Sequence, residues 1–409
     1  MRKDQNVEKS RHKNKNRPKD AAFLQQNLSA YQPILTVGTS IPYLIPMIII
    51  YLTFGWICVD YQKNIVEYRY DYTDCLDHST GEHCATISDQ NLALPHKNRT
   101  DCQCHLKISL DKSIPKDVFI YYSLDGFFQN YRPYVSSLDY FQFSGLKLFC
   151  DKNDDNNDLF LDDDDDNNFD DSLRSPCGSA ANSLFNDTFS LMRLIHTIAD
   201  DDDNNTEINS FLFPVPILRT NKTWKSSPLF RNPSPTISNK SCEIFNDTNS
   251  RLKCIFENTQ KPKNWPKPIY ELDLDHQDNN GFENEDLIVW LRPAAFPSFR
   301  KIYGRIDHRA NNNMLNDGLR KGSYLIKINY SYPVHMFGGR KSIILSNTSF
   351  LGCRNYFLCF CSISLSIILT LMMIIFYFLD KKYGQISLQM YQYIRNYTEE
   401  DNRDGMRRR

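Results

Sequence analysis

The chain has 409 residues, with 48 Lys and Arg against 49 Asp and Glu and a formal net charge of −1. This balance excludes the basic footprint of nucleic-acid-binding domains, so we expect no nucleic-acid partner. Two apolar segments without a charged residue, 41–59 and 356–379, indicate a membrane protein. As helices they would span about 28 and about 36 Å, enough to cross a bilayer.

The chain ends flank these spans and are basic. Residues 1–38 hold eight Lys and Arg against three Asp and Glu, and residues 380–409 hold seven against five. Positive residues concentrate on the cytosolic side of membrane spans, so we expect both termini in the cytosol. Within the first tail, residues 20–31 predict a short amphipathic helix along the membrane surface. No small-residue cleavage site follows the first span, 39–59, which we interpret as an uncleaved signal anchor.

The residues between the spans, 60–355, are expected to form one large domain in the lumen or outside the cell. The domain carries nine of the twelve cysteines: Cys353 lies just outside the second span as the odd thiol, and the other eight are expected to pair, because such a compartment favours disulfides. Cysteines two apart on a strand face the same side, so Cys102 and Cys104 would bond to different upstream partners. Spacing alone leaves many pairings open. The pairs that fit best are Cys75–Cys104 nested around Cys84–Cys102, then Cys150–Cys177 and Cys242–Cys254.

A zinc site is the competing interpretation of these cysteines, but the sequence has no paired Cys-x-x-Cys spacing, and we expect no metal. The same domain carries Asn-x-Ser/Thr sequons, which lie on surface loops where they are glycosylated. An eighth sequon, at Asn347, lies so close to the second span that we do not expect its modification. Glycosylation is expected at Asn98, Asn186, Asn204, Asn221, Asn239, Asn246 and Asn329.

Strand patterns dominate the large domain. Aromatic and β-branched residues alternate or cluster at Val118–Leu124 and Tyr324–Tyr330, which predicts two strands. Asn280-Gly281 resembles a hairpin turn before a third strand, over Leu287–Leu291. A helix is expected around Ala180–Asn186.

Two low-complexity acidic inserts, 151–171 and 200–205, are predicted to be disordered loops. The segment DLDHQDNNGFENED resembles a calcium loop, but His276 and Leu287 occupy positions that need oxygen ligands. We therefore predict a turn rich in Asx residues there, without a bound metal.

The sequence contains no P-loop, no Gly-x-Ser-x-Gly elbow and no His-Glu-x-x-His motif, so we expect no catalytic site, no cofactor and no enzyme activity. The second span places Ser362, Ser366 and Thr370 at intervals of four residues, on one helix face. Such a stripe favours close packing against another helix. A pore lining is the competing interpretation, but no charge within the spans marks an ion path.

Five stretches, in order and spanning almost the whole chain, resemble one family: the accessory (beta) subunits of the phospholipid flippases, or type-IV P-type ATPases. The family is also known by the names cell-division-control protein fifty and ligand-effect modulator. The stretches are Arg17-Pro18 through AAFLQQNLSAYQPILT, YYSLDGFFQNYRPYV (121–135), PCGSAANSLFNDTF (176–189), NEDLIVWLRPAAFPSFRKIYGRI (284–306) and YPVHMFGGRKSIILSNTSFLG (332–352).

The resemblance implies a membrane protein whose two transmembrane helices flank a large, mainly antiparallel-β, sandwich-like and disulfide-bonded domain. It implies a non-catalytic subunit that forms a heterodimer with a catalytic P-type ATPase among membrane lipids. Such a subunit assists the folding, the endoplasmic-reticulum exit and the activity of an ATPase that moves phospholipids to the cytosolic leaflet. Its residence would be the endoplasmic reticulum, Golgi, endosome or plasma membrane. The family's first disulfides match Cys75–Cys104, Cys84–Cys102 and Cys150–Cys177.

The partner interface is expected in three places. Core packing is the competing interpretation for its aromatic residues. The candidates are Phe127, Phe128, Tyr131 and Arg132 in the lumen, Phe23, Gln25, Gln26 and Gln32 in the cytosol, and Ser362, Ser366 and Thr370 in the membrane. The chain departs from the family at the acidic inserts, at the Cys242–Cys254 pair, at Pro133 and at Cys353. A two-span ion channel with a disulfide-rich ectodomain is the alternative function, and a lumenal glycosyltransferase is a third.

Overall fold

The structure is a computed structural model. It describes residues 23, 37–92, 94, 98–149, 174–199, 207–223, 229–238, 242–310 and 315–407. The expected juxtamembrane helix, apart from Phe23, and both acidic inserts lie outside these residues. The chain forms two compact units: residues 58–356, called the β unit below, and the two chain ends, 1–57 with 357–409.

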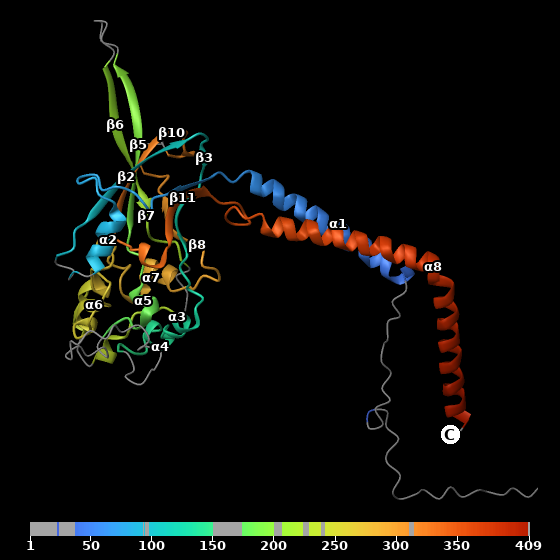
Figure 1. Cartoon of the computed structure of the whole chain (residues 1–409). Coiled ribbons are helices and arrows are strands. Elements are labelled where there is room, and N and C mark those ends of the chain that lie inside the picture. The colour runs from blue at the N-terminus through green and yellow to red at the C-terminus, as the bar shows by residue number, and fades with distance from the viewer. Residues whose placement is uncertain are drawn as a thin grey trace, which may run out of the picture. The chain divides into compact units, whose positions relative to one another are not determined.

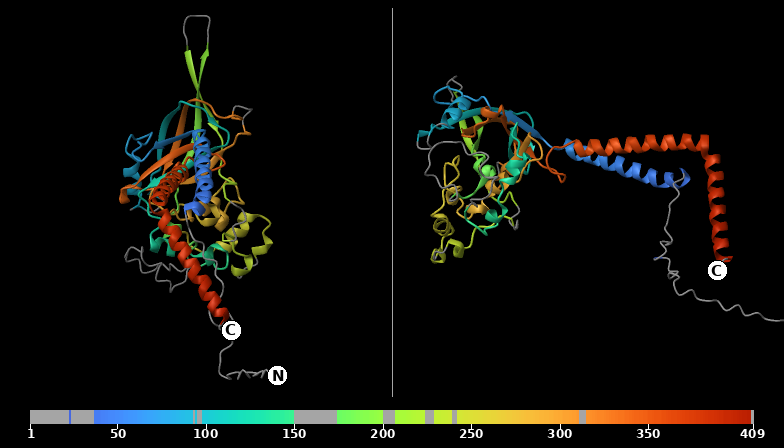
Figure 2. Two further views of the ribbon diagram at one scale, coloured as in Figure 1. Left: turned by 90° about the vertical axis from the view of Figure 1, so that its right-hand side faces the viewer. Right: turned by 60° about the horizontal axis from the view of Figure 1, so that its bottom comes forward.

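Two long helices dominate the unit built from the chain ends. They are α1 (Val37–Lys63), which contains Pro42 and Pro46, and α8 (Phe357–Arg407). Their apolar parts, Ser40–Lys63 and Phe357–Gly384, are long enough to cross a membrane. The first predicted span, 39–59, falls within α1; the second, 356–379, begins one residue before α8, which continues well past Leu379. Figure 2 shows α1 and α8 running alongside each other.

The β unit is built on two antiparallel sheets (Figure 1). The five-stranded sheet has the order β1 (Glu67–Asp71), β11 (Arg340–Asn347), β4 (Val118–Asp125), β8 (Phe299–Ile306) and β7 (Ile217–Leu218). The four-stranded sheet has the order β2 (Cys102–Leu110), β10 (Gly322–Tyr330), β5 (Thr188–Ala199) and β6 (Glu207–Val215). A small ribbon pairs β3 (Ile114–Pro115) with β9 (Gly318–Leu319).

Short helices connect the strands. The α-helices are α2 (Cys84–Leu92), α3 (Arg132–Ser136), α4 (Tyr140–Phe143), α5 (Gly178–Asn182), α6 (Thr248–Phe256) and α7 (Glu285–Trp290). The 3₁₀ helices are η4 (Pro235–Ser238), η5 (Cys242–Ile244), η6 (Ile269–Glu271), η7 (Gly281–Glu283) and η8 (His335–Phe337). Helices α3 to α7 gather at the end of the β unit that lies opposite the projecting β5–β6 hairpin (Figure 1).

Side-chain alternation explains how the sheets face each other. In β10 every second side chain from Tyr324 to Tyr330 is buried, while the residues between them are half-buried, as the period of a strand requires. Aromatic rings fill the space between the sheets. The ring of Phe189 in β5 lies 4.8 Å from Tyr303 in β8, and its backbone N–H donates to the Tyr303 hydroxyl. The sequence-predicted strands β4 and β10 and the antiparallel sandwich are confirmed.

A buried ion pair joins the two sheets. Lys341 in β11 donates to Asp187, just before β5, across 2.7 Å, and both side chains are fully buried. Asp187 also accepts the Tyr72 hydroxyl and two backbone N–H groups, those of Ser331 and Tyr332. Burial lowers the pKa of Lys341 to about 8, although Asp187 opposes that shift. The hydrogen bonds satisfy the carboxylate, which a buried charge requires.

The predicted hairpin turn at Asn280-Gly281 and the strand over Leu287–Leu291 are wrong. The chain instead forms η7 and then helix α7, which begins at Glu285. The Asn284 side chain caps this helix by accepting the Leu287 N–H, and the acidic residues of the first turn favour a helix N-terminus. The apolar run looks like a strand because a one-and-a-half-turn buried helix shows no clear period.

The expected helix around Ala180–Asn186 is present but ends at Asn182. Its first residue, Gly178, has φ +87°, and a Cβ there would lie 2.0 Å from the Ser137 carbonyl oxygen. Two indole N–H groups, those of Trp290 and Trp265, donate to the consecutive carbonyls of Ala180 and Ala181. Only small residues let the helix approach its surroundings this closely.

The expected disulfides Cys75–Cys104, Cys84–Cys102 and Cys242–Cys254 are present. Cys177 is also disulfide-bonded. Because Cys150 lies outside the described residues, its pairing with Cys177 stays a prediction. The nested pair ties the segment before α2 to strand β2, where Cys102 and Cys104 do point to one side of the strand.

Candidate partner-binding surface

The loop after β4 holds the aromatic residues expected at the lumenal interface. Gln129 is fully buried: its amide donates to the Trp290 carbonyl and the Tyr134 hydroxyl, and its oxygen accepts the Ala294 N–H. Burial raises the pKa of Tyr134 to about 12. The loop is therefore anchored by a hydrogen-bonded core residue, and the side chains on either side of Gln129 have fixed directions.

Phe127 points into the β unit. Its ring contacts five other aromatic rings, with centroid distances between 5.5 and 6.4 Å: Tyr134, Trp290, Phe299, Tyr332 and Phe337. For Phe127 the structure thus favours core packing, the competing interpretation, over contact with a partner.

Phe128 and Tyr131 point outward and are exposed, as is Arg132. The segment before β8 runs beside this loop, because Asn130 donates to the Ala295 carbonyl across 2.9 Å. On that segment Phe296 is even more exposed than Phe128. We call Phe128, Tyr131 and Phe296 the aromatic platform. Exposed apolar residues that are grouped and rigidly supported are typical of protein interfaces.

A buried lysine fixes the C-terminal end of α7, from which the chain continues to Phe296. The Lys301 ammonium group donates to the carbonyls of Val289, Trp290 and Arg292, at the C-terminal end of α7. Burial, followed by the charge of Arg292, lowers its pKa to about 7. A lysine at this place satisfies carbonyls that a helix end leaves free.

Acidic residues at the other end of α7 hold a loop that the sequence reasoning missed. Glu285 accepts the consecutive backbone N–H groups of Asn221, Lys222 and Thr223. Asp286 pairs with Lys222 and Arg219. Burial alone would raise the pKa of Asp286, but the two cations outweigh it and the pKa is lowered. The signal was the Glu-Asp pair in the fourth stretch, although its partners are more than 60 residues away.

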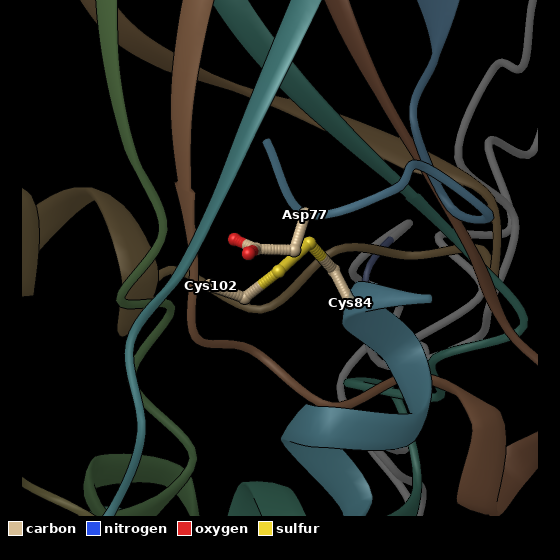
Figure 3. Close-up of side chains that lie close together, drawn as sticks. All are labelled: Asp77, Cys84 and Cys102. Atoms are coloured by element: carbon tan, nitrogen blue, oxygen red, sulfur yellow. A yellow bond between two sulfur atoms is a disulfide. The ribbon is translucent and has the colours of Figure 1, made fainter. Parts of the chain in front are cut away.

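The described residues hold one group with the proximity of a metal site: Asp77, Cys84 and Cys102 (Figure 3). The two sulfur atoms are bonded to each other, so neither offers a thiolate. Hydrogen bonds from Ser79 and Thr80, and from the Gln103 backbone, lower the pKa of Asp77. These donors occupy its carboxylate, and the group does not fit a metal ion.

The segment that resembles a calcium loop, residues 273–286, begins with a hydrogen-bonded turn. Asp273 accepts the N–H groups of Asp275 and His276, and Asn280 exchanges hydrogen bonds with the backbone of Asp273. The expected turn rich in Asx residues is therefore present.

The hydroxyl stripe of the second span meets the chain's own first span. Ser366 donates to the Ile48 carbonyl across 3.3 Å, and a Cβ on Gly55 would lie 2.7 Å from the side chain of Ile363. Ser362 and Ser366 are buried, whereas Thr370 is half-buried. For the two serines the structure favours packing within the chain over contact with a partner. It does not favour a pore lining.

The remaining predicted residues are placed as follows. Phe23 is exposed, while Gln25, Gln26 and Gln32 lie outside the described residues. Among the sequons, Asn98, Asn221 and Asn246 are exposed, and Asn186 and Asn329 are half-buried, the latter in the central strand β10. Asn204 and Asn239 fall outside the described residues, so glycosylation stays a prediction.

A model of the LEM3 (ligand-effect modulator 3) family / CDC50 family matches residues 58–385. The chain belongs to the LEM3/CDC50 family. Cell cycle control protein 50A of Bos taurus is 36% identical over 376 residues, covering 91% of each chain. Cell cycle control protein 50B of Homo sapiens is 34% identical over 349 residues, covering 83% of this chain and 87% of its own. Putative ALA-interacting subunit 4 of Arabidopsis thaliana is 31% identical over 349 residues, covering 83% of this chain and 82% of its own.

The resemblance to the LEM3/CDC50 family is therefore confirmed, and the structure gives its motifs a physical reason. The second stretch forms β4, the loop with Phe128, and α3. The third forms α5 and the segment with Asp187, and the fourth forms α7, the Phe296 segment and β8. The fifth contributes η8 and β11 with Lys341. Stretches distant in the sequence thus build the platform and the buried ion pair together.

Proposed function

We propose that this LEM3/CDC50 chain is the non-catalytic accessory subunit of a phospholipid flippase. In this role it forms a heterodimer with a type-IV P-type ATPase and supports its folding, its exit from the endoplasmic reticulum and its activity in moving phospholipids to the cytosolic leaflet. The proposal is carried by one observation: a family member presents exposed aromatic side chains on a rigid, hydrogen-bonded support. One of its relatives is itself named an ALA-interacting subunit.

The proposed topology places the β unit in the lumen or outside the cell and both termini in the cytosol. The disulfides support this side, because they persist in oxidising compartments. Exposed sequons at Asn98, Asn221 and Asn246 are accessible to glycosylation there. The protein would reside in a membrane of the secretory pathway.

The aromatic platform is the proposed contact with the ATPase. Aromatic and arginine side chains contribute most of the binding energy in typical interfaces, and the exposed Arg132 directly follows Tyr131 of the platform in the chain. Since Gln129 and Lys301 already fix the supporting loops, binding would not have to order them. Docking of the membrane helices beside the same partner would raise the effective concentration of the platform.

The test is affinity purification of the tagged full-length chain in mild detergent, followed by mass spectrometry. A large P-type ATPase is expected in the eluate. Replacement of the platform by alanine, in the triple variant Phe128→Ala/Tyr131→Ala/Phe296→Ala, should lower its recovery at least tenfold. Leu274→Ala is the matched control, because Leu274 is equally exposed but lies in the Asx-rich turn.

Two results would contradict the proposal at different levels. A homo-oligomer of the wild-type chain without any ATPase argues against the accessory-subunit function. Equal ATPase recovery by the triple variant and the wild type leaves that function intact but removes the platform from the interface. Thermal unfolding of the purified variants checks that all of them are folded.

A further inference from the structure

The two segments that connect the β unit to its candidate spans are tied side by side. We call residues 61–66 and 347–356 the neck. The buried side chain of Gln62 accepts the Asn355 N–H across 2.9 Å. Asn347 accepts the Val66 N–H across 2.8 Å, and its amide nitrogen donates to the Asn64 carbonyl. The neck is therefore a structured part of the β unit and not a pair of loose linkers.

A tight turn projects from the neck. Ser349 and Gly352 exchange two backbone hydrogen bonds of 2.9 Å, and the Ser349 hydroxyl accepts the Leu351 N–H. Phe350 lies at the tip of this turn and is 93% exposed, more than any other large apolar side chain among the described residues. A phenyl ring at the tip of a rigid turn leaves apolar surface exposed to water, which is unfavourable unless something covers the ring.

The base of the turn is fixed to the five-stranded sheet. The carbonyl of Arg354 accepts a hydrogen bond from Arg300 in β8, and the Cys353 thiol donates to the Tyr121 hydroxyl in β4. These hydrogen bonds hold the turn in a fixed orientation relative to the five-stranded sheet.

The neck contains residue types that are common where a protein chain meets a membrane surface. Lys63 ends the first candidate span and Phe357 begins the second. Exposed Tyr61 and Tyr356 lie next to these limits, and the Arg354 guanidinium lies 5.4 Å from the Tyr356 ring centroid. Tyrosine rings are enriched at both faces of a membrane, where spans meet the lipid headgroups, and long basic side chains near the ends of spans extend toward that interface.

We propose that Phe350 inserts into the lipid headgroup region beside the two spans, as a third contact of the chain with the bilayer. The occupant is lipid because the tip is only seven residues from Phe357 along the chain, within about 25 Å even when fully extended. Along the chain, the turn is also continuous with Arg354 and Tyr356, the basic and aromatic residues that precede the second span. This inference does not depend on the proposed flippase function.

The test uses tryptophan fluorescence of the full-length chain in lipid nanodiscs. Phe350→Trp is compared with Ile244→Trp, a substitution at a 77% exposed side chain in η5, away from the neck. The four native tryptophans give the same background in both variants. Lipids brominated on the upper acyl chain should quench at least half of the emission added at position 350 and almost none of that added at position 244. Equal, weak quenching of both would overturn the proposal.

A photo-reactive benzoylphenylalanine at position 350 separates lipid from protein as the occupant. Lipid adducts support the inference. Adducts confined to a co-purifying polypeptide would overturn it and place a protein partner over the turn instead.

Discussion

The pair Lys341–Asp187 offers the most quantitative test of what holds the two sheets together. Lys341→Met keeps the length of the side chain and removes its charge. The Asp187 carboxylate would then remain fully buried, with hydrogen bonds from Tyr72 and two backbone N–H groups but without a cation. Removal of one partner of a buried ion pair costs about 3–5 kcal/mol, since the other charge stays uncompensated.

The expected magnitude exceeds that of an ordinary substitution. One kcal/mol shifts the melting temperature by roughly 2–4 °C in domains of 150–250 residues. Lys341→Met should therefore lower the melting temperature by at least about 6 °C. In the double variant with Asp187→Asn, the penalty should be smaller than the sum of the single penalties, by about 0.5–3 kcal/mol, because the orphaned charge is also removed. The Asn186 sequon is kept in this variant, because Thr188 is unchanged.

The assay is thermal unfolding of the full-length chain in detergent, followed by near-ultraviolet circular dichroism. Lys107→Met in β2 is the control, because Lys107 is exposed and its loss should change stability by less than about 0.5 kcal/mol. A Lys341→Met protein that melts together with this control would refute the reasoning that the buried pair carries the packing of the sheets.

Three further predictions concern single positions. Gly178→Ala should destabilise the β unit by more than about 2 kcal/mol, because its methyl group would strike a backbone carbonyl; Gly81→Ala shares the positive φ but meets open space, so chemical denaturation should separate the two. Lys301 has a folded pKa of about 7 against 10.5 unfolded, so between these values the unfolded chain holds an extra proton. Stability should therefore rise with pH above 7, by up to about 1.4 kcal/mol per unit, and melting curves of Lys301→Met should lack that slope. Gly55→Val should separate the two spans, whereas Gly38→Val should not; proximity labelling between the spans would reveal the difference, and equal labelling would contradict the observed seam.

β4 is buried on both faces over most of its length, so its β-branched and aromatic composition predicted the strand. Periodicity predicted β10, where buried and half-buried residues alternate. It failed at Leu287–Leu291, where the apolar run is too short to distinguish a strand from a capped helix. The cap was visible in the sequence as Asn284 followed by Glu285 and Asp286.

The candidate surface could be predicted only in part. The sequence identified Phe127 and Phe128 together, but adjacent residues on a loop carry no period that says which one faces the core. The buried roles of Lys301 and Lys341 could not be read from the sequence, because lysines usually lie at the surface. The carboxylate partner of Lys341 is 154 residues away, so no local pattern announces it.

The neck has a consequence for how the protein is made. Asn347 begins an Asn-Thr-Ser sequon, yet both polar atoms of its amide are used to join the two chain segments. An oligosaccharide is attached through that same amide nitrogen, and it cannot fit where the side chain is only 8% exposed. A molecule glycosylated at Asn347 during synthesis could not form the hydrogen bonds that join the two segments of the neck. A glycan on Asn347 and the hydrogen-bonded neck are therefore mutually exclusive.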